Sequence, residues 1–133
     1  MSQQNNEATT RAFYERVLAG DAEGAIAELM TPDVVWDNPL PDPIPYGGSF
    51  EGAAGAGRYL GLIFGTLDIE SFEIDEIIAA GDRVVVLGHE TARTLKTDRR
   101  YSGQWVHVLR FRDGRIQHVR EYNDTAEMLS AFE

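Results

Sequence analysis

The segment YSGQWVHVLRFRDGRIQHVREYN, residues 101–123, decides the fold of this chain. Large apolar side chains recur with a period of two on both sides of Asp113-Gly114. Such alternation around an Asp-Gly pair is the strongest short-range signal for a β-hairpin, because both residues tolerate the positive φ of the turn. On the first strand apolar groups occupy both faces, and one face also carries His107 between Trp105 and Leu109. That face is therefore expected to belong either to the core or to a lined cavity.

Size and composition limit the possible functions. The 133 residues fit a single domain, residues 1–133, whose core is large enough to be stable without disulfide bonds. The absence of cysteine excludes disulfides, thiolate metal sites and cysteine nucleophiles. The net charge of −10 argues against nucleic acids and anionic membranes as partners, since both are bound through clustered positive charge.

The sequence has neither the layout of a membrane span nor that of a signal peptide. No apolar run approaches the ~20 residues of a transmembrane helix. Residues 2–7 are polar and lack the charged-then-apolar order of a secretory signal. A cytoplasmic protein that makes no membrane contact is therefore expected.

Helices are predicted first along the chain and strands after them. Helical spacing of apolar residues predicts helices over 8–19, 22–30 and 53–64, and Asp124 can cap a short helix over 124–132. Strands are predicted over 34–36, 68–80, 83–96 and the two arms of the hairpin. Residues 38–48 are rich in proline and are expected to form a stiff loop, as a lid or rim. This order is an α+β layout, in which a twisted antiparallel sheet can curl over its helices and leave a pocket.

Short motifs along nearly the whole chain give it a family resemblance. In order they are Ala19-Gly20-Asp21, Val34-Val35-Trp36-Asp37-Asn38-Pro39, Tyr46-Gly47-Gly48, Trp105-Val106-His107-Val108, Phe111-Arg112-Asp113-Gly114-Arg115-Ile116 and Glu121-Tyr122-Asn123-Asp124-Thr125. Together they resemble the nuclear-transport-factor-2-like superfamily, and within it the SnoaL-like and ketosteroid-isomerase-like groups. The resemblance implies a cone-shaped, curved antiparallel sheet wrapped around N-terminal helices, a cystatin-like α+β barrel. It also implies a conical cavity and a dimer formed through the outer face of the sheet.

Asp37 is the first candidate catalytic residue. It stands where steroid isomerases of the family resembled keep a proton-shuttling aspartate. On the residues alone, it ends a hydrophobic strand and precedes Asn38-Pro39. A carboxylate at the mouth of an apolar cavity has a raised pKa and can act as a base near neutral pH. The alternative is an aspartate that only caps the turn before the proline.

His107 and Glu121 are the other candidate catalytic residues. The resemblance places His107 where the isomerases keep a protonated acid that donates into the oxyanion hole, and the alternative is a core histidine. If His107 faces the cavity, strand parity places Val119, Glu121 and Asn123 there as well. Glu121 could then orient the imidazole. The alternative for Glu121 is a solvated or salt-bridged residue.

One position departs from the steroid isomerases. Their oxyanion tyrosine should fall at Phe13, which has no hydroxyl. Tyr14 is the next residue, but one step along a helix turns a side chain by ~100°. Delta-5-3-ketosteroid isomerase activity is therefore not expected.

The remaining candidates are substrate-binding residues that would form the walls of the cavity. They are Phe13, Tyr14, Trp36, Tyr46, Tyr59, Glu90, Trp105, Val119 and Asn123. Ordinary core packing is the alternative for the aromatic residues, above all for Tyr59. The three histidines lack metal-ligand spacing, and no glycine-rich phosphate loop follows a strand, so neither a metal nor a cofactor is expected.

Two functions from different classes fit this sequence. The first is a cofactor-independent isomerase, cyclase or lyase that applies acid–base chemistry to an apolar, carbonyl-containing substrate, with Asp37 as base and His107 as donor to the oxyanion. The second is a non-catalytic module that holds a small apolar molecule. In either case the outer face of the hairpin, with Val106, Val108 and Tyr122, predicts a homodimer at micromolar concentration. Arg110, His118 and Arg120 on that face would need acidic partners or a place at the rim.

Overall fold

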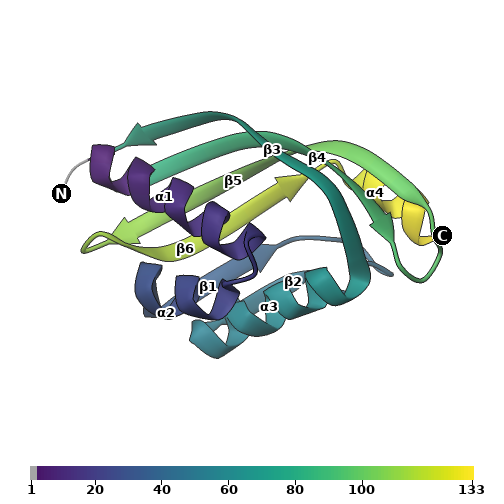
Figure 1. The fold of residues 1–133 in the computed structure, drawn as a ribbon, viewed down its shortest axis with the longest axis horizontal. Coiled ribbons are helices and arrows are strands. Elements are labelled where there is room, and N and C mark those ends of the chain that lie inside the picture. Colours follow the sequence, from purple (N-terminus) through teal and green to yellow (C-terminus); the bar gives the residue numbers. More distant parts are fainter. Residues whose placement is uncertain (1–2) are drawn as a thin grey trace.

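The computed structural model describes residues 3–133 as an α+β fold. Its elements run in the order α1 (Gln3–Leu18), α2 (Ala22–Leu29), β1 (Met30–Asn38), β2 (Gly48–Glu51), α3 (Gly52–Thr66), β3 (Leu67–Ala80), β4 (Arg83–Thr94), β5 (Arg100–Arg112), β6 (Arg115–Asn123) and α4 (Thr125–Phe132). The strands form one curved, unclosed sheet in the order β2-β1-β6-β5-β4-β3. Helices α1, α2 and α3 lie on one face of this sheet, and α4 lies at the end where the chain finishes (Figure 1).

The hairpin expected over residues 101–123 is confirmed as β5 and β6. Asp113 and Gly114 adopt φ values of 52° and 79° in the turn, as the Asp-Gly pair predicts. The register pairs His107 with Glu121 and Trp105 with Asn123. Because side chains alternate between the two faces of a strand, His107 and Glu121 both point toward the helices.

Strand β1 makes the sheet mixed, whereas the sequence predicted only antiparallel strands. It runs from Met30 to Asn38, whereas a strand was expected only over residues 34–36. It pairs in parallel with β6. A parallel pair needs a long connection, and here most of the chain lies between the two strands. The register places Trp36 opposite Val119 and Asp37 opposite Arg120. The inner face of β1 therefore presents Trp36 and Asn38, and Asp37 lies on the outer face.

The helix boundaries follow local capping signals. Asp21 caps α2 by accepting a hydrogen bond from the Gly24 backbone at 3.1 Å, and Asp124 caps α4 by accepting one from Glu127 at 3.2 Å. The expected cap of the C-terminal helix is thus confirmed. Strand β2 was not predicted, because its four residues follow a proline-rich loop and bury only Phe50. None of the helices among residues 3–133 is long and apolar enough to cross a membrane.

The outer face of the sheet carries the residues expected at a dimer interface. Val106 and Val108 are half-buried in the single chain, and Tyr122 and Ile78 are exposed. Two of the basic residues on this face already have an acidic partner within the chain, since His118 and Arg120 both contact Asp37. They therefore do not need a second copy for neutralisation, and the homodimer stays a prediction.

Candidate functional site

A cavity lies between the helices and the inner face of the sheet. Its volume is about 70 Å³, well below the ~300–1,000 Å³ of pockets that hold drug-sized ligands. It therefore suits one small ring, and a larger molecule would have to extend through the opening. Leu18 at the end of α1 and Phe64 near the end of α3 line the cavity, yet they are 49% and 43% exposed. These two residues accordingly mark the opening.

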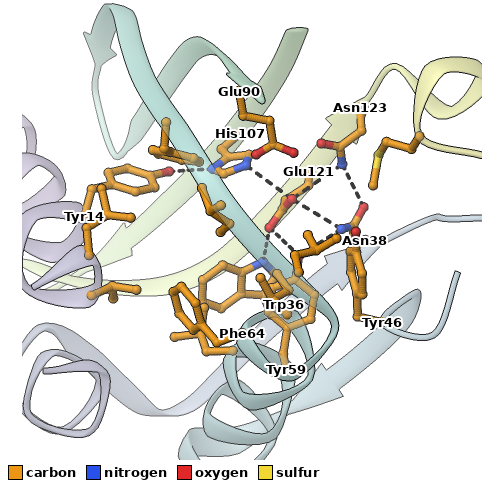
Figure 2. A pocket seen from close by; sticks show the side chains of 18 of the residues that line it. Tyr14, Trp36, Asn38, Tyr46, Tyr59, Phe64, Glu90, His107, Glu121 and Asn123 are labelled. Carbon is orange, nitrogen blue, oxygen red and sulfur yellow. Dashed lines mark hydrogen bonds and ion pairs between the residues drawn. The ribbon is translucent and has the colours of Figure 1, made fainter. Parts of the chain in front are cut away.

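Glu121 is the polar centre of the cavity. Trp36 and Tyr59 donate hydrogen bonds to its Oε2, each at 2.7 Å. Asn38 Nδ2 donates to Oε1 at 3.2 Å, and His107 Nε2 lies 3.2 Å from the same oxygen. Figure 2 shows these side chains converging on the carboxylate from β1, α3 and β5. A buried carboxylate that accepts this many hydrogen bonds is held in one position.

The network around Glu121 keeps it ionised. Burial alone would raise the pKa of this carboxyl, but the charge of His107 and the hydrogen bonds from His107, Tyr59 and Trp36 outweigh it and lower the pKa. Burial and the neighbouring Glu121 raise the pKa values of Tyr14 and Tyr59, so both phenols stay protonated. The site therefore pairs a fixed anion with neutral hydroxyl donors.

His107 connects Glu121 to Tyr14. The Tyr14 hydroxyl lies 2.6 Å from His107 Nδ1, and Trp105 stacks on the imidazole with ring centroids 4.3 Å apart. Because an ionised carboxylate only accepts hydrogen bonds, Nε2 carries a proton toward Glu121. Nδ1 then accepts from Tyr14 in the neutral ring, or donates to the Tyr14 oxygen in the imidazolium. The three residues form a chain along which a proton can move.

Glu90 is a second carboxyl in the cavity, with a different environment. Among the described residues it accepts a single hydrogen bond, from the Tyr101 hydroxyl to its Oε2 at 2.7 Å. Its carboxyl group is turned toward the region of His107 and Asn123 (Figure 2). Burial, and then the negative charge of Glu121, raise the pKa of Glu90. Two carboxyls with pKa values moved in opposite directions are a common arrangement for acid–base chemistry.

The raised pKa of Glu90 predicts a pH-dependent effect of replacing it. A carboxyl whose pKa is higher in the folded state contributes stability below its unfolded pKa and loses it as the pH rises through the folded pKa. Glu90→Gln keeps an acceptor for Tyr101 and removes the ionisation. The variant should therefore exceed the wild-type free energy of unfolding at pH 8, and this advantage should vanish at pH 4.

Urea unfolding of both proteins at the two pH values measures this difference. Glu121 is present in both proteins, so its own titration cancels in the difference between their free energies of unfolding. An equal stability difference at pH 4 and pH 8 would show that Glu90 titrates like an exposed glutamate.

The structure brings most of the sequence-predicted residues together. The cavity wall includes His107, Glu121, Phe13, Tyr14, Trp36, Tyr46, Tyr59, Glu90 and Asn123. The contact expected between Glu121 and His107 is present. The proline-rich loop, expected as a lid or rim, contributes Tyr46 to the wall, where this residue is only 2% exposed.

The expected position of Asp37 at the cavity is wrong. Its carboxylate lies on the outer face of the sheet, 2.7 Å from His118 Nε2 and 3.7 Å from Arg120. Burial would raise its pKa, but the hydrogen bonds from His118 and Ser49 and the charges of His118 and Arg120 lower it. The expected raised pKa is therefore also wrong. The reason is strand parity, because the inward position at the end of β1 belongs to Asn38.

Two smaller expectations also need correction. Trp105 packs against His107 and Phe72 without reaching the cavity wall, and Val119 is buried in the core at 2% exposure.

Sequence reasoning missed two polar residues of the site. Asn38 and Tyr101 both line the cavity. Asn38 looked like the first residue of the proline-rich loop, and a correct parity for β1 would have identified it. Tyr101 shares the inward parity of His107 on β5, so extending that alternation by three steps would have found it.

A metal centre has no obvious ligand set here. Within residues 3–133, no group of three or more histidine, aspartate or glutamate side chains is arranged to hold a metal ion.

Comparisons with known proteins place this chain in a family. No curated protein gives a significant sequence match. An NTF2-like protein from Burkholderia xenovorans LB400 is 29% identical, with a TM-score of 0.91 over 100% of this chain and 99% of that one. An NTF2-like protein of unknown function from Burkholderia pseudomallei K96243 is 31% identical, with a TM-score of 0.82 over 98% of each chain.

A third solved structure carries a small molecule. TerC, co-crystallised with polyporic acid, is 28% identical, with a TM-score of 0.79 over 96% of this chain and 97% of that one. The family model for the SnoaL-like domain matches residues 10–119. The chain therefore belongs to the SnoaL-like domain family of the NTF2-like superfamily.

Proposed function

We propose that this protein binds a small, apolar, carbonyl-containing molecule in the cavity and catalyses its isomerisation, cyclisation or a related lyase reaction by acid–base chemistry. The observation that carries the proposal is the buried chain from Tyr14 through His107 to Glu121, which opens onto an apolar cavity beside a second carboxyl, Glu90. No cofactor is needed for this chemistry.

In this proposal Tyr14 binds the carbonyl oxygen of the substrate. When His107 is protonated, its Nδ1–H donates to the Tyr14 oxygen and leaves the Tyr14 hydroxyl free to donate to the substrate. Glu121 holds the positive charge of the imidazolium. Negative charge that develops on the carbonyl oxygen is then met by a donor fixed in a water-poor site, which is an effective form of transition-state stabilisation.

Glu90 is the base in this proposal. It takes a proton from the carbon next to the carbonyl, and the electron pair of the C–H bond forms the C=C bond of an enolate. Return of that proton to another carbon gives an isomer. Alternatively, the enolate carbon attacks a second carbonyl of the same molecule and closes a ring, and the alkoxide formed there takes up the proton held by Glu90. A carboxyl with a raised pKa suits this role, because it is a stronger base than an ordinary glutamate once ionised.

The comparisons support the small-molecule part of the proposal. TerC, which shares the fold across nearly its whole length, was co-crystallised with polyporic acid. The cavity of this chain offers aromatic walls and polar groups for a small molecule.

Proton abstraction can be tested without knowing the natural substrate. Hydrophobic ketones that raise the melting temperature are incubated with the protein in D₂O, and deuterium uptake next to the carbonyl is followed by mass spectrometry. Wild-type protein should accelerate uptake for at least one such ketone. Tyr14→Phe, His107→Gln and Glu90→Gln should each slow it by ~10²–10⁴-fold, the usual contribution of a general acid or base.

The matched control is His118→Gln, which makes the same substitution on the outer face of the sheet. It should leave deuterium uptake unchanged, as should Asp37→Asn, because both residues lie outside the cavity. Full activity in the folded Tyr14→Phe and Glu90→Gln variants would refute the assignment.

A specific observation also favours a second candidate, a non-catalytic module that holds an apolar ligand. Glu121 is so fully hydrogen-bonded that the polar groups around it can act purely as a rigid scaffold. Ketones that raise the melting temperature but show no deuterium uptake or other conversion would support this module over the enzyme.

A further inference from the structure

Tyr46 places a hydroxyl in the cavity that the chemistry above does not use. The residue is 2% exposed, and its ring packs against those of Tyr59 and Phe132, with centroids 6.4 Å and 6.2 Å apart. A phenylalanine would make the same ring contacts. The hydroxyl is therefore the feature that needs an explanation.

Among the described residues, this hydroxyl makes no well-formed hydrogen bond. The neighbouring Tyr101 hydroxyl interacts with it and affects its pKa, but no side chain of residues 5–133 meets full hydrogen-bond geometry with the Tyr46 oxygen. The two neighbouring tyrosine hydroxyls direct their protons elsewhere, because Tyr101 donates to Glu90 and Tyr59 donates to Glu121. Leaving a buried donor unpaired is unfavourable, so such groups usually meet a ligand or an ordered water.

The position of Tyr46 separates it from the oxygen site proposed at Tyr14. Tyr14 belongs to α1, and Tyr46 belongs to the proline-rich loop between β1 and β2. Figure 2 shows Tyr14 beyond His107 on one side of Glu121 and Tyr46 on the other side. The loop is held in place by the hydrogen bonds Leu40 N–Asn38 O and Ile44 N–Pro41 O, so the hydroxyl is well positioned for recognition.

From these observations we infer that Tyr46 forms a second polar subsite, which binds a second oxygen of the ligand. The substrate class is thus narrowed to a single-ring carbonyl compound that also carries a hydroxyl or carbonyl group elsewhere on the ring. This inference rests on the proposed function only in assigning the first carbonyl to Tyr14. The cavity has room for a single ring, and larger substituents on that ring would extend out through the opening at Leu18 and Phe64.

Positional isomers of acetophenone can test the subsite by binding alone. The 2-, 3- and 4-hydroxyacetophenones are each compared with the methylacetophenone of the same substitution, because a hydroxyl and a methyl group have similar size. An apolar wall would favour the methyl compound. The subsite predicts that wild-type protein prefers at least one hydroxylated isomer by about tenfold in Kd, the effect of a well-made buried hydrogen bond. Isothermal titration calorimetry measures both affinities.

Tyr46→Phe is the decisive variant. It should abolish the preference for the hydroxylated isomer while binding the methyl compound with unchanged or higher affinity. It should also melt at the same temperature as wild-type protein or higher, because the deleted hydroxyl makes no hydrogen bond in the free protein. A hydroxyl that served only the fold would instead lower the melting temperature when removed.

Two controls separate this inference from the proposed function. Tyr59→Phe deletes another tyrosine hydroxyl of the same cavity, but one that donates to Glu121. This variant should lower the affinity for the hydroxyl and the methyl compound equally. His107→Gln should slow deuterium uptake by the ~10²–10⁴-fold stated above and leave the hydroxyl preference intact. Equal affinities of wild-type protein for every hydroxyl and methyl pair would overturn the subsite, even with normal catalysis. A preference that survives in Tyr46→Phe would overturn it as well.

Discussion

Glu121→Ala should lower the free energy of unfolding by roughly 3–5 kcal/mol, the cost of removing one partner from a buried ionic network. The carboxylate accepts hydrogen bonds from Trp36, Tyr59 and Asn38 and faces His107. Alanine would leave these donors buried without an acceptor, and it would leave a space where the side chain was. Urea denaturation at pH 7 measures the loss.

Glu70→Ala is the matched control for this prediction. Glu70 also lies on a strand of the sheet and also pairs with a cation, since it accepts from Arg100 at 2.8 Å. That pair is largely exposed to solvent, so its loss should cost at most ~1 kcal/mol. If the two variants were equally stable, the network around Glu121 would contribute no more than an ordinary surface pair.

Gly88→Ala should be the most damaging single-methyl change outside the cavity, at about 3 kcal/mol, the upper end of the usual cost of overpacking. A Cβ at Gly88 would lie 2.4 Å from the Glu73 carbonyl oxygen and closer still to the Trp105 ring. The first contact is with backbone of the neighbouring strand and cannot be relieved by a side-chain rotation. The second pushes on the indole that stacks against His107. The variant should therefore lose stability and also disturb the site.

Gly57→Ala provides the comparison for Gly88→Ala. Gly57 lies inside α3, and a Cβ there would meet no atom within 4 Å. Alanine should therefore stabilise the helix by up to ~1 kcal/mol through its higher helix propensity. Urea unfolding of both variants, with near-ultraviolet circular dichroism to follow the tryptophan environment, would distinguish them. A Gly88→Ala protein as stable as wild type would mean that β3 and β4 can separate locally at little cost.

Local signals in the sequence are enough to predict the hairpin and the helix caps. The turn at Asp113-Gly114 and the alternation on either side of it depend on residues within a few positions of each other. The same holds for Asp21 and Asp124, each of which accepts from a backbone amide three residues later. The pairing of His107 with Glu121 follows directly from that local register. The family resemblance and the α+β class are confirmed by the family model and the structure.

The sequence cannot show which face of β1 meets the helices. That orientation depends on pairing with β6, about eighty residues later in the chain, and a shift of one residue exchanges the two faces of a strand. Asp37 and Asn38 are neighbours in the sequence, yet one contacts His118 outside the sheet and the other contacts Glu121 inside the cavity. Only the tertiary register decides between them.

The sequence by itself determined the α+β class of the fold, the strand register of the hairpin and the fact that His107 and Glu121 share one face of it. The tertiary structure alone decided the protonation preferences and the partners of these groups. Glu121 stays ionised because donors from β1, α3 and β5 meet at one point, and Tyr14 reaches His107 because of how α1 lies against the sheet. Such convergence depends on the packing of distant elements, and a pKa is set by the charges, hydrogen bonds and burial that this packing creates.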